Sequence, residues 1–277
     1  MKEPVWHHPG TLAEALALRT GLGEDALPIA GGTYIGALLS SGLIDPPPAF
    51  IALGGIEELR TIALADGHLA LGALVTHRRV EREAALRAGG FAAVADAFAC
   101  VANVRIRTLA TVGGVLADAD YASDPPALLC ALGSHAVLAS PRGERRLAIE
   151  ELILGHYETA IEPDELLIRA EVPRPQRAVY LKFRSRSSED RPCAGVAAAV
   201  GQSGDLRVVV GAVSDTPQIL PEVCALAAGR DLTADVREEI AARYGEGIEA
   251  LGDLRGSAGY RRRVTRVLVR RALEAVA

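Results

Sequence analysis

Two pairs of adjacent glycines stand where a polypeptide backbone could bind phosphate. The first pair belongs to Ile29-Ala30-Gly31-Gly32-Thr33-Tyr34-Ile35-Gly36, which continues a short apolar stretch. Because glycine accepts positive φ and lets a ligand approach the main chain, successive N–H groups can point into one concavity. The sequence predicts a helix from Tyr34 to Ser41, whose positive end would suit a pyrophosphate and whose start the Thr33 hydroxyl could cap. The alternative is a plain strand–turn–helix junction that needs glycine only for its geometry.

The second pair lies in Ala110-Thr111-Val112-Gly113-Gly114. It is followed by three aspartates, Asp118, Asp120 and Asp124. The segment is not the GxGxxG pattern of a Rossmann site, and no GK[ST] follows either pair, which excludes a P-loop. Two phosphate-type loops with nearby carboxylates fit a ligand that has a diphosphate and a polyhydroxyl chain. The aspartates could equally be helix caps, and Asp124 before Pro125 predicts an N-cap for a helix that ends at Gly133.

The elements that would hold these loops mix helices and strands. Residues 11–14 form a capping box that opens a helix, and a strand at 27–30 leads into the first glycine pair. The pattern alternates on both sides of Asp66-Gly67, which predicts a hairpin, and Thr76 could cap the helix that follows. The stretch 104–124, which contains the second pair, is expected to be irregular after a preceding Ala-rich helix.

A proline-rich segment, Pro173-Arg174-Pro175, follows a predicted strand at 165–172 and marks a domain boundary. After it we expect a strand at 179–184, a hairpin around 203–205, and helices from Glu222 to the end. The order is α+β, because the regular βαβ alternation of a doubly wound sheet is absent. The predicted domains are 1–172, with subdomains of about 1–56 and 57–172, and 173–277.

Composition narrows the class of protein. The 277 residues carry a formal net charge of −5, which argues against nucleic acid as a main partner. The arginine-rich stretch 261–271 is interpreted as the solvated face of a helix, with an acidic partner surface as the alternative.

No apolar run approaches the roughly 20 residues of a membrane span, and the N-terminus lacks a secretory signal. Four scattered cysteines without a CxxC indicate reduced thiols, no metal on this chain and a cytoplasmic location.

In this order, these motifs resemble the FAD-binding subunit of xanthine dehydrogenase and carbon monoxide dehydrogenase type enzymes. The resemblance covers nearly the whole chain, and its most specific part is Arg105-Ile106-Arg107-Thr108-Leu109 with the second glycine pair and Asp124. Each motif alone is unspecific, whereas the ordered set is not. The matching segments are residues 6–15, 29–36, 67–76, 105–114, 128–133, 159–167 and 180–186, Tyr260 and the arginine-rich end.

The resemblance implies a two-part FAD-binding domain of the vanillyl-alcohol-oxidase (PCMH) type and a smaller α+β C-terminal domain with an antiparallel sheet. It also implies that residues 29–36 and 111–114 hold the FAD pyrophosphate and adenosine side through backbone N–H groups. Asp124 corresponds to an aspartate that contacts the cofactor, and Leu167 and Lys182 to positions near the flavin ring. The cofactor-binding residues implied are Ile29, Ala30, Gly31, Gly32, Thr33, Tyr34, Ile35, Ala110, Thr111, Val112, Gly113, Gly114, Asp124, Leu167 and Lys182.

The implied function is electron transfer within a molybdenum hydroxylase. A large subunit would carry molybdopterin, a small subunit would carry [2Fe–2S] clusters, and FAD here would pass electrons to an acceptor such as NAD⁺ or oxygen. No catalytic side chain is then required, and the six histidines are interpreted as structural or solvated. Two other functions stay open: a stand-alone FAD oxidoreductase, and an assembly or scaffold protein that has lost the flavin.

Two positions depart from the pattern of the family. Val115 stands where Asn or Ser is usual, which removes one polar contact from a site built largely of backbone. Tyr121 stands where Pro is common, and it could stack on a ring or simply cover the loop.

Overall fold

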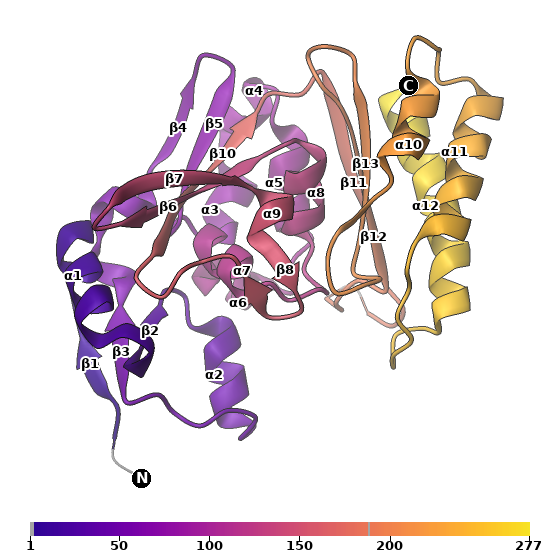
Figure 1. Ribbon diagram of the computed structural model, residues 1–277. Coiled ribbons are helices and arrows are strands. Elements are labelled where there is room, and N and C mark those ends of the chain that lie inside the picture. Colours follow the sequence, from indigo (N-terminus) through magenta and orange to yellow (C-terminus); the bar gives the residue numbers. More distant parts are fainter. Residues whose placement is uncertain (1–2, 188) are drawn as a thin grey trace.

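A three-stranded parallel sheet begins the computed structural model, which describes residues 3–187 and 189–277 (Figure 1). Its strand order is β1-β3-β2, and the helices α1 and α2 provide the crossovers that parallel strands require. The Thr11 hydroxyl caps α1 by accepting from the Glu14 N–H at 3.2 Å, as predicted. The bounds are β1 (Val5–His7), α1 (Leu12–Leu22), β2 (Ala26–Ile29), α2 (Thr33–Ser40) and β3 (Ala49–Ala52).

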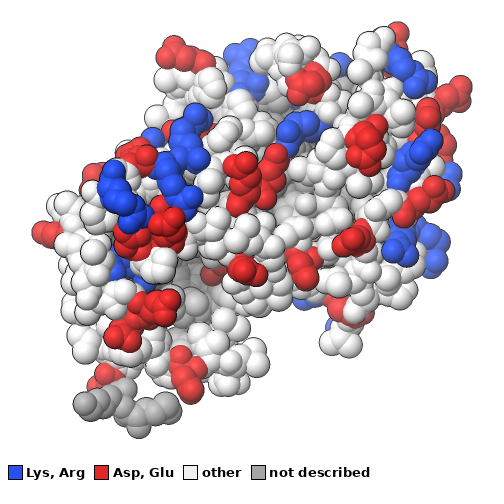
Figure 2. Space-filling view, in the orientation of Figure 1, with Lys and Arg blue, Asp and Glu red and all other residues white. Residues whose placement is uncertain are grey.

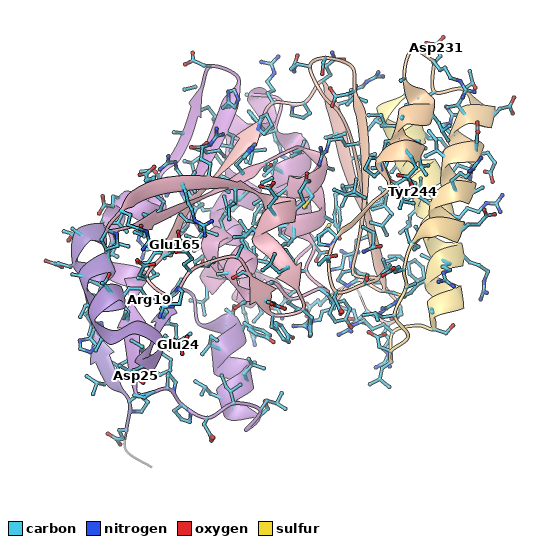
Figure 3. The ribbon with its side chains drawn as sticks, in the orientation of Figure 1. Arg19, Glu24, Asp25, Glu165, Asp231 and Tyr244 are labelled. Atoms are coloured by element: carbon cyan, nitrogen blue, oxygen red, sulfur yellow. The ribbon has the colours of Figure 1, made fainter. Side chains whose placement is uncertain are left out.

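Arg19 connects α1 to the strand that leads into the first glycine pair. Its guanidinium donates to the carbonyl oxygens of Gly23 and Ala26 at 2.8 and 2.7 Å, across the 3₁₀ turn η1 (Gly23–Asp25) (Figure 3). These bonds satisfy carbonyl groups at the end of the helix and hold the start of β2 against it. The first glycine pair therefore begins from a fixed strand.

A five-stranded antiparallel sheet follows, in the order β4-β5-β10-β6-β7. The predicted turn at Asp66-Gly67 is confirmed: both residues have positive φ, 49° and 75°, and they join β4 directly to β5. The strands are β4 (Ile62–Ala65), β5 (His68–Gly72), β6 (His135–Ser140), β7 (Gly143–Ala148) and β10 (Leu166–Pro173). The 3₁₀ turns η2 (Leu53–Gly55) and η3 (Glu57–Arg60) precede the sheet.

Short helices pack on this sheet, and they include a correction to the sequence interpretation. The stretch 104–118, expected to be irregular, forms α6 (Val104–Leu109) and α7 (Val112–Asp118), capped by the side chains of Asn103 and Thr111. Helices of six and seven residues are too short to show a clear apolar period, so the pattern did not reveal them. The other elements are α3 (His77–Arg82), α4 (Ala84–Ala88), α5 (Ala92–Ala99), α8 (Pro125–Ala131), α9 (Ile149–Leu152), β8 (Ile153–Gly155) and β9 (Glu158–Thr159).

The C-terminal part is a four-stranded antiparallel sheet, β11-β12-β13-β14, covered by two long helices (Figure 1). Its other face contacts α8 so closely that a Cβ at Gly211 would lie 2.8 Å from the Cβ of Ala127. One hydrophobic core therefore continues from the five-stranded sheet into the C-terminal sheet. The elements are β11 (Arg177–Phe183), β12 (Ala194–Val200), β13 (Leu206–Gly211), β14 (Gln218–Ile219), α10 (Pro221–Cys224), η4 (Ala225–Ala227), α11 (Ala234–Gly247) and α12 (Ala258–Val276).

The arginine-rich helix α12 is only partly the solvated face that the sequence predicted. Basic and acidic side chains are interspersed over α11 and α12 (Figure 2). Among them, Arg266 pairs with Glu238. Arg261, in contrast, is fully buried and pairs with Asp253 at 2.8 Å. A buried guanidinium needs a charged partner, and here a loop supplies it. Within the described residues, no helix combines the length and apolar content that crossing a membrane requires.

Candidate cofactor-binding site

The first glycine pair forms the junction between β2 and α2. Gly32 has φ of 65° and occupies the N-cap position, so Thr33 is the first helical residue and its hydroxyl does not cap the helix, contrary to the prediction. In the part of the chain that the structure describes, no other side chain caps α2. Among the described residues, none accepts a hydrogen bond from the backbone N–H groups of residues 31–35. Five consecutive donors are therefore available at the positive end of α2.

The first loop lies directly against the segment that carries the second. A Cβ at Gly31 would lie 2.0 Å from the carbonyl oxygen of Leu109, the last residue of α6. A side chain at this position is excluded by backbone, which cannot move aside as a flexible side chain could. Gly31 is thus required for packing between the two loops, and that packing brings residues 29–35 beside residues 109–110.

The second glycine pair is bound to the chain segment after β5. The N–H groups of Val112 and Gly113 donate to the carbonyl oxygens of Val75 and Ala73 at 2.9 and 2.8 Å. The Gly114 N–H donates to the capping hydroxyl of Thr111 at 3.1 Å. Because these internal bonds use the N–H groups of residues 112–114, these groups are not free to bind a phosphate. The second loop therefore supports the site structurally. The free donors lie on the first loop.

His77 also holds the second loop, and sequence reasoning did not single it out. The His77 Nε2 lies 3.1 Å from the carbonyl oxygen of Thr111, and the backbone N–H of His77 donates to the carbonyl oxygen of Ala110. The imidazole ring packs edge-on against Phe98. Burial lowers the pKa of His77 to about 4, which leaves the imidazole neutral with its proton on Nε2. The only local signal was its position after Thr76, which caps α3 as predicted.

Asp124, Lys182 and Tyr180 form a buried polar cluster. Lys182 Nζ lies 2.8 Å from Asp124 Oδ2, and the Tyr180 hydroxyl donates to Asp124 Oδ1 at 2.8 Å. The Lys182 and Asp124 side chains are only 2% and 4% exposed, so the pair is shielded from solvent. Burial raises the pKa of Asp124, and the Lys182 ammonium opposes that change.

The predicted capping role of Asp124 is wrong. The residue precedes α8, but it has helical φ and ψ and its side chain makes no cap hydrogen bond. Tyr180 and Lys182 on β11 take both carboxylate oxygens instead. Lys182 also donates to the carbonyl oxygen of Cys100 at 2.9 Å, which connects β11 to the end of α5. The cluster therefore joins the C-terminal sheet to the first part of the chain.

Leu167, a predicted cofactor residue, and Val115, a departure from the family pattern, both pack in the main hydrophobic core. Leu167 is buried in β10 beside a register irregularity, and α7 packs on this strand. Val115, one of the two departures, is half-buried and packs on the main core. The structure thus brings the two glycine loops together and, separately, joins Asp124 to Lys182.

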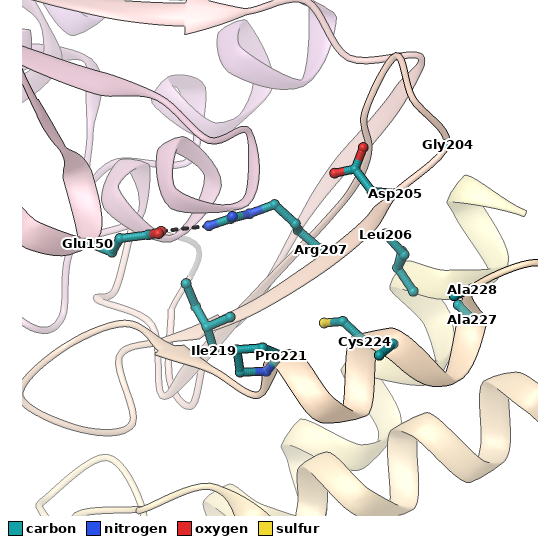
Figure 4. A pocket seen from close by; sticks show the side chains of 11 residues that line it. Glu150, Gly204, Asp205, Leu206, Arg207, Ile219, Pro221, Cys224, Ala227 and Ala228 are labelled. Atoms are coloured by element: carbon teal, nitrogen blue, oxygen red, sulfur yellow. Dashed lines mark hydrogen bonds and ion pairs between the residues drawn. The ribbon is translucent and has the colours of Figure 1, made fainter.

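A cavity of about 500 Å³ lies away from these residues, against β13 and α10 (Figure 4). Leu206, Ile219 and Cys224 line it, and Arg207 pairs with Glu150 at 2.6 Å on its wall. It contains none of the predicted cofactor residues, so it does not contribute to the candidate site.

Two protein families match nearly the whole chain. Residues 1–175 match the family described as "FAD binding domain in molybdopterin dehydrogenase", and residues 179–276 match "CO dehydrogenase flavoprotein C-terminal domain". The chain belongs to this FAD-binding family of molybdopterin dehydrogenases. The family predicted from the sequence is confirmed.

Members of the family share length and fold with this chain. The carbon monoxide dehydrogenase medium chain of Afipia carboxidovorans is 32% identical over 97% of this chain and 95% of its own length. The glyceraldehyde dehydrogenase medium chain of Sulfolobus acidocaldarius is 28% identical over 96% of each chain. A chain of reconstituted CO dehydrogenase from Oligotropha carboxidovorans matches with a TM-score of 0.93 and 30% identity, covering 99% of this chain and 97% of that one. The predicted fold class and the oxidoreductase assignment are confirmed.

The residues of the site fit the cofactor of the family. The diphosphate of FAD needs several aligned donors, and the free N–H groups of residues 31–35 provide them at a helix start. The exposed side of α2 leaves room, since a Cβ at Gly36 would meet no atom within 4 Å. These observations fit a bound diphosphate at the first loop.

Proposed function

We propose that this chain binds FAD with its pyrophosphate at the first glycine loop. The observation that supports this is the row of five free backbone donors, 31–35, at the N-terminus of α2. The second loop packs behind them and fixes their direction. The cofactor-binding residues proposed are Ile29, Ala30, Gly31, Gly32, Thr33, Tyr34, Ile35, Ala110, Thr111, Val112, Gly113, Gly114, Asp124, Leu167 and Lys182.

Lys182 and Asp124 define the proposed flavin end of the site. Their ion pair and the Tyr180 hydroxyl fix the Lys182 ammonium in a buried position, where the Asp124 carboxylate balances its charge. This cluster would orient the flavin end of the cofactor without adding a net charge beside it. When bound, FAD supplies the redox chemistry, and the chain supplies orientation and charge.

The proposed partners are a large molybdopterin-binding subunit and a small [2Fe–2S] subunit, with this chain carrying electrons onward from the clusters. The support is similarity along the full length to proteins named as medium chains. The acceptor is NAD⁺, oxygen or a quinone-type carrier, and the location is the cytoplasm. We also propose 1–172 as the FAD-binding domain and 173–277 as the C-terminal domain, where β10 gives way to β11.

The test is the visible absorption spectrum of the purified chain, followed by titration of the apo-protein with FAD. Two matched variants show whether FAD binding depends on the first glycine loop. Gly31→Ala inserts a methyl group 2.0 Å from the Leu109 carbonyl and should weaken FAD binding at least tenfold, whereas Gly21→Ala, in α1, has free space and should bind like wild type. Circular dichroism checks that both fold. A colourless wild-type chain that binds no added FAD would overturn the proposal and favour the scaffold function.

A further inference from the structure

We propose that Tyr34, Tyr157, His156 and Tyr121 form an aromatic ladder through which the C-terminal part positions the first glycine loop, making Tyr121 and Tyr157 positioning residues for the cofactor. This inference rests on the proposed function. To the first glycine loop, which contains Tyr34, it adds three residues outside both glycine loops: Tyr157, His156 and Tyr121.

The ladder is a continuous series of ring contacts. Tyr34, the second residue of α2, lies 5.1 Å from Tyr157 between ring centroids. Tyr157 lies 3.7 Å from His156, and His156 lies 4.8 Å from Tyr121 with the rings nearly perpendicular. The contacts at 5.1 and 4.8 Å have the separations at which tilted and edge-to-face rings attract one another, and His156 and Tyr157 between them are neighbours in the chain. Four rings therefore connect the helix start at the first loop to the segment after α7.

Helix α2 has little else to hold it. None of its residues is fully buried, and it projects from the N-terminal sheet (Figure 1). Its N-terminal N–H groups can align on a diphosphate only if the helix axis is fixed. The contact of Tyr34 with Tyr157 lies one residue after Thr33, so it acts at the end of the helix that carries the donors.

The backbone at the middle of the ladder has an unusual conformation, and one hydrogen bond joins the two residues that adopt it. Tyr157 has φ of 63° and Ala119 has φ of 47°, in the left-handed region that non-glycine residues rarely adopt. The Tyr157 N–H donates to the carbonyl oxygen of Ala119 at 3.1 Å. Because Ala119 ends α7, which begins at the second glycine pair, this bond ties the ladder to both loops. Such conformations persist only where the surroundings fix them.

The far end of the ladder is anchored in the C-terminal part. The Tyr121 hydroxyl donates to Asp253 Oδ2 at 2.6 Å, and Arg255 contacts both groups. The fully buried Arg261 lies 2.8 Å from the other oxygen of Asp253. Burial by itself would raise the pKa of Asp253. The hydrogen bonds from the Tyr121 hydroxyl and the Arg255 backbone N–H, together with the charge of Arg261, outweigh burial and hold this pKa below its usual range. Asp253 stays ionised, so the anchor persists throughout the neutral pH range.

Tyr121 is one of the two departures from the family pattern, where Pro is common. A proline would have no hydroxyl for Asp253 and no aromatic face for His156. The ring of Tyr121 packs within the protein, against His156.

The experiment compares four variants of the whole chain for FAD dissociation constant, visible circular dichroism of the bound flavin, and melting temperature without added FAD. Tyr157→Asn removes the ring but tolerates positive φ, and Tyr157→Phe keeps the ring. Tyr121→Phe keeps the ring and removes the hydroxyl, and with it the bonds to Asp253 and Arg255. Tyr260→Phe is the control, because its partly exposed hydroxyl makes no hydrogen bond among the described residues.

We expect Tyr157→Asn and Tyr121→Phe to raise the FAD dissociation constant about threefold to tenfold and to change the flavin dichroism. Tyr157→Phe and Tyr260→Phe should stay within about twofold of wild type, which is the rescue expected of a ring contact. If the first two variants bind FAD like wild type, or only their melting temperature falls, the ladder is structural and the inference is wrong. Failure of the wild type to bind FAD would instead overturn the proposed function.

Discussion

Lys182 and Asp124 lie 58 positions apart in sequence, and their side chains meet at 2.8 Å with almost no exposure to solvent. The pair joins β11 of the C-terminal part to the start of α8. Removing one partner from a buried pair leaves an uncompensated charge, which costs far more than the pair itself contributes.

We therefore expect Lys182→Met to lower the free energy of unfolding by roughly 3 to 5 kcal/mol at pH 7, measured by urea unfolding. The double variant Lys182→Met with Asp124→Asn should recover part of this loss, because the unpaired carboxylate is gone. Arg87→Met is the control: it breaks the exposed pair with Asp96 and should cost less than about 1 kcal/mol. Equal losses in the Lys182 and Arg87 variants would show that the buried pair has no special role.

His77 makes stability depend on pH. Its folded pKa of about 4 lies below the usual value of 6.5, so between these values the unfolded chain binds the proton and the folded chain does not. The contribution of neutral His77 to the free energy of unfolding is therefore fully present above pH 6.5. It falls as the pH decreases toward 4, by about 3 kcal/mol in total. Urea unfolding at pH 7, 6 and 5 measures this slope. His77→Gln, which can still donate to Thr111, should flatten it; an unchanged slope would assign the effect to other groups.

Asp118 makes the free energy of unfolding depend on pH in the opposite direction. Burial and the neighbouring Asp120 raise its pKa to about 7, well above the usual 3.8. The unfolded chain loses this proton first, so the contribution to stability is full below pH 3.8 and is lost as pH rises toward 7. Asp118→Asn should raise the free energy of unfolding by roughly 1 to 3 kcal/mol at pH 8 and by less at pH 5. Asp66→Asn, in an exposed turn, should change neither value, and a loss of stability in Asp118→Asn at pH 8 would contradict the prediction.

The sequence by itself determined the features that depend on neighbouring residues. The turn at Asp66-Gly67 follows from residue types that accept positive φ, and the caps at Thr11 and Thr76 follow from hydroxyls placed before helices. The ordered motifs also identified the family before any contact was known. Helices α6 and α7 were missed, because six or seven residues show too little of the apolar period.

Only the tertiary structure decided what these residues do. Gly31 is required by the Leu109 carbonyl, and Asp124 binds Lys182 and Tyr180 where its position before Pro125 indicated a cap. Arg261 belongs to an arginine run that reads as a solvated face, yet it is buried against Asp253. In each case the deciding partner comes from another element, in some cases more than 50 residues away. Side-chain type and local spacing specify which groups can bond, whereas packing between distant segments selects the partner and excludes water from the contact.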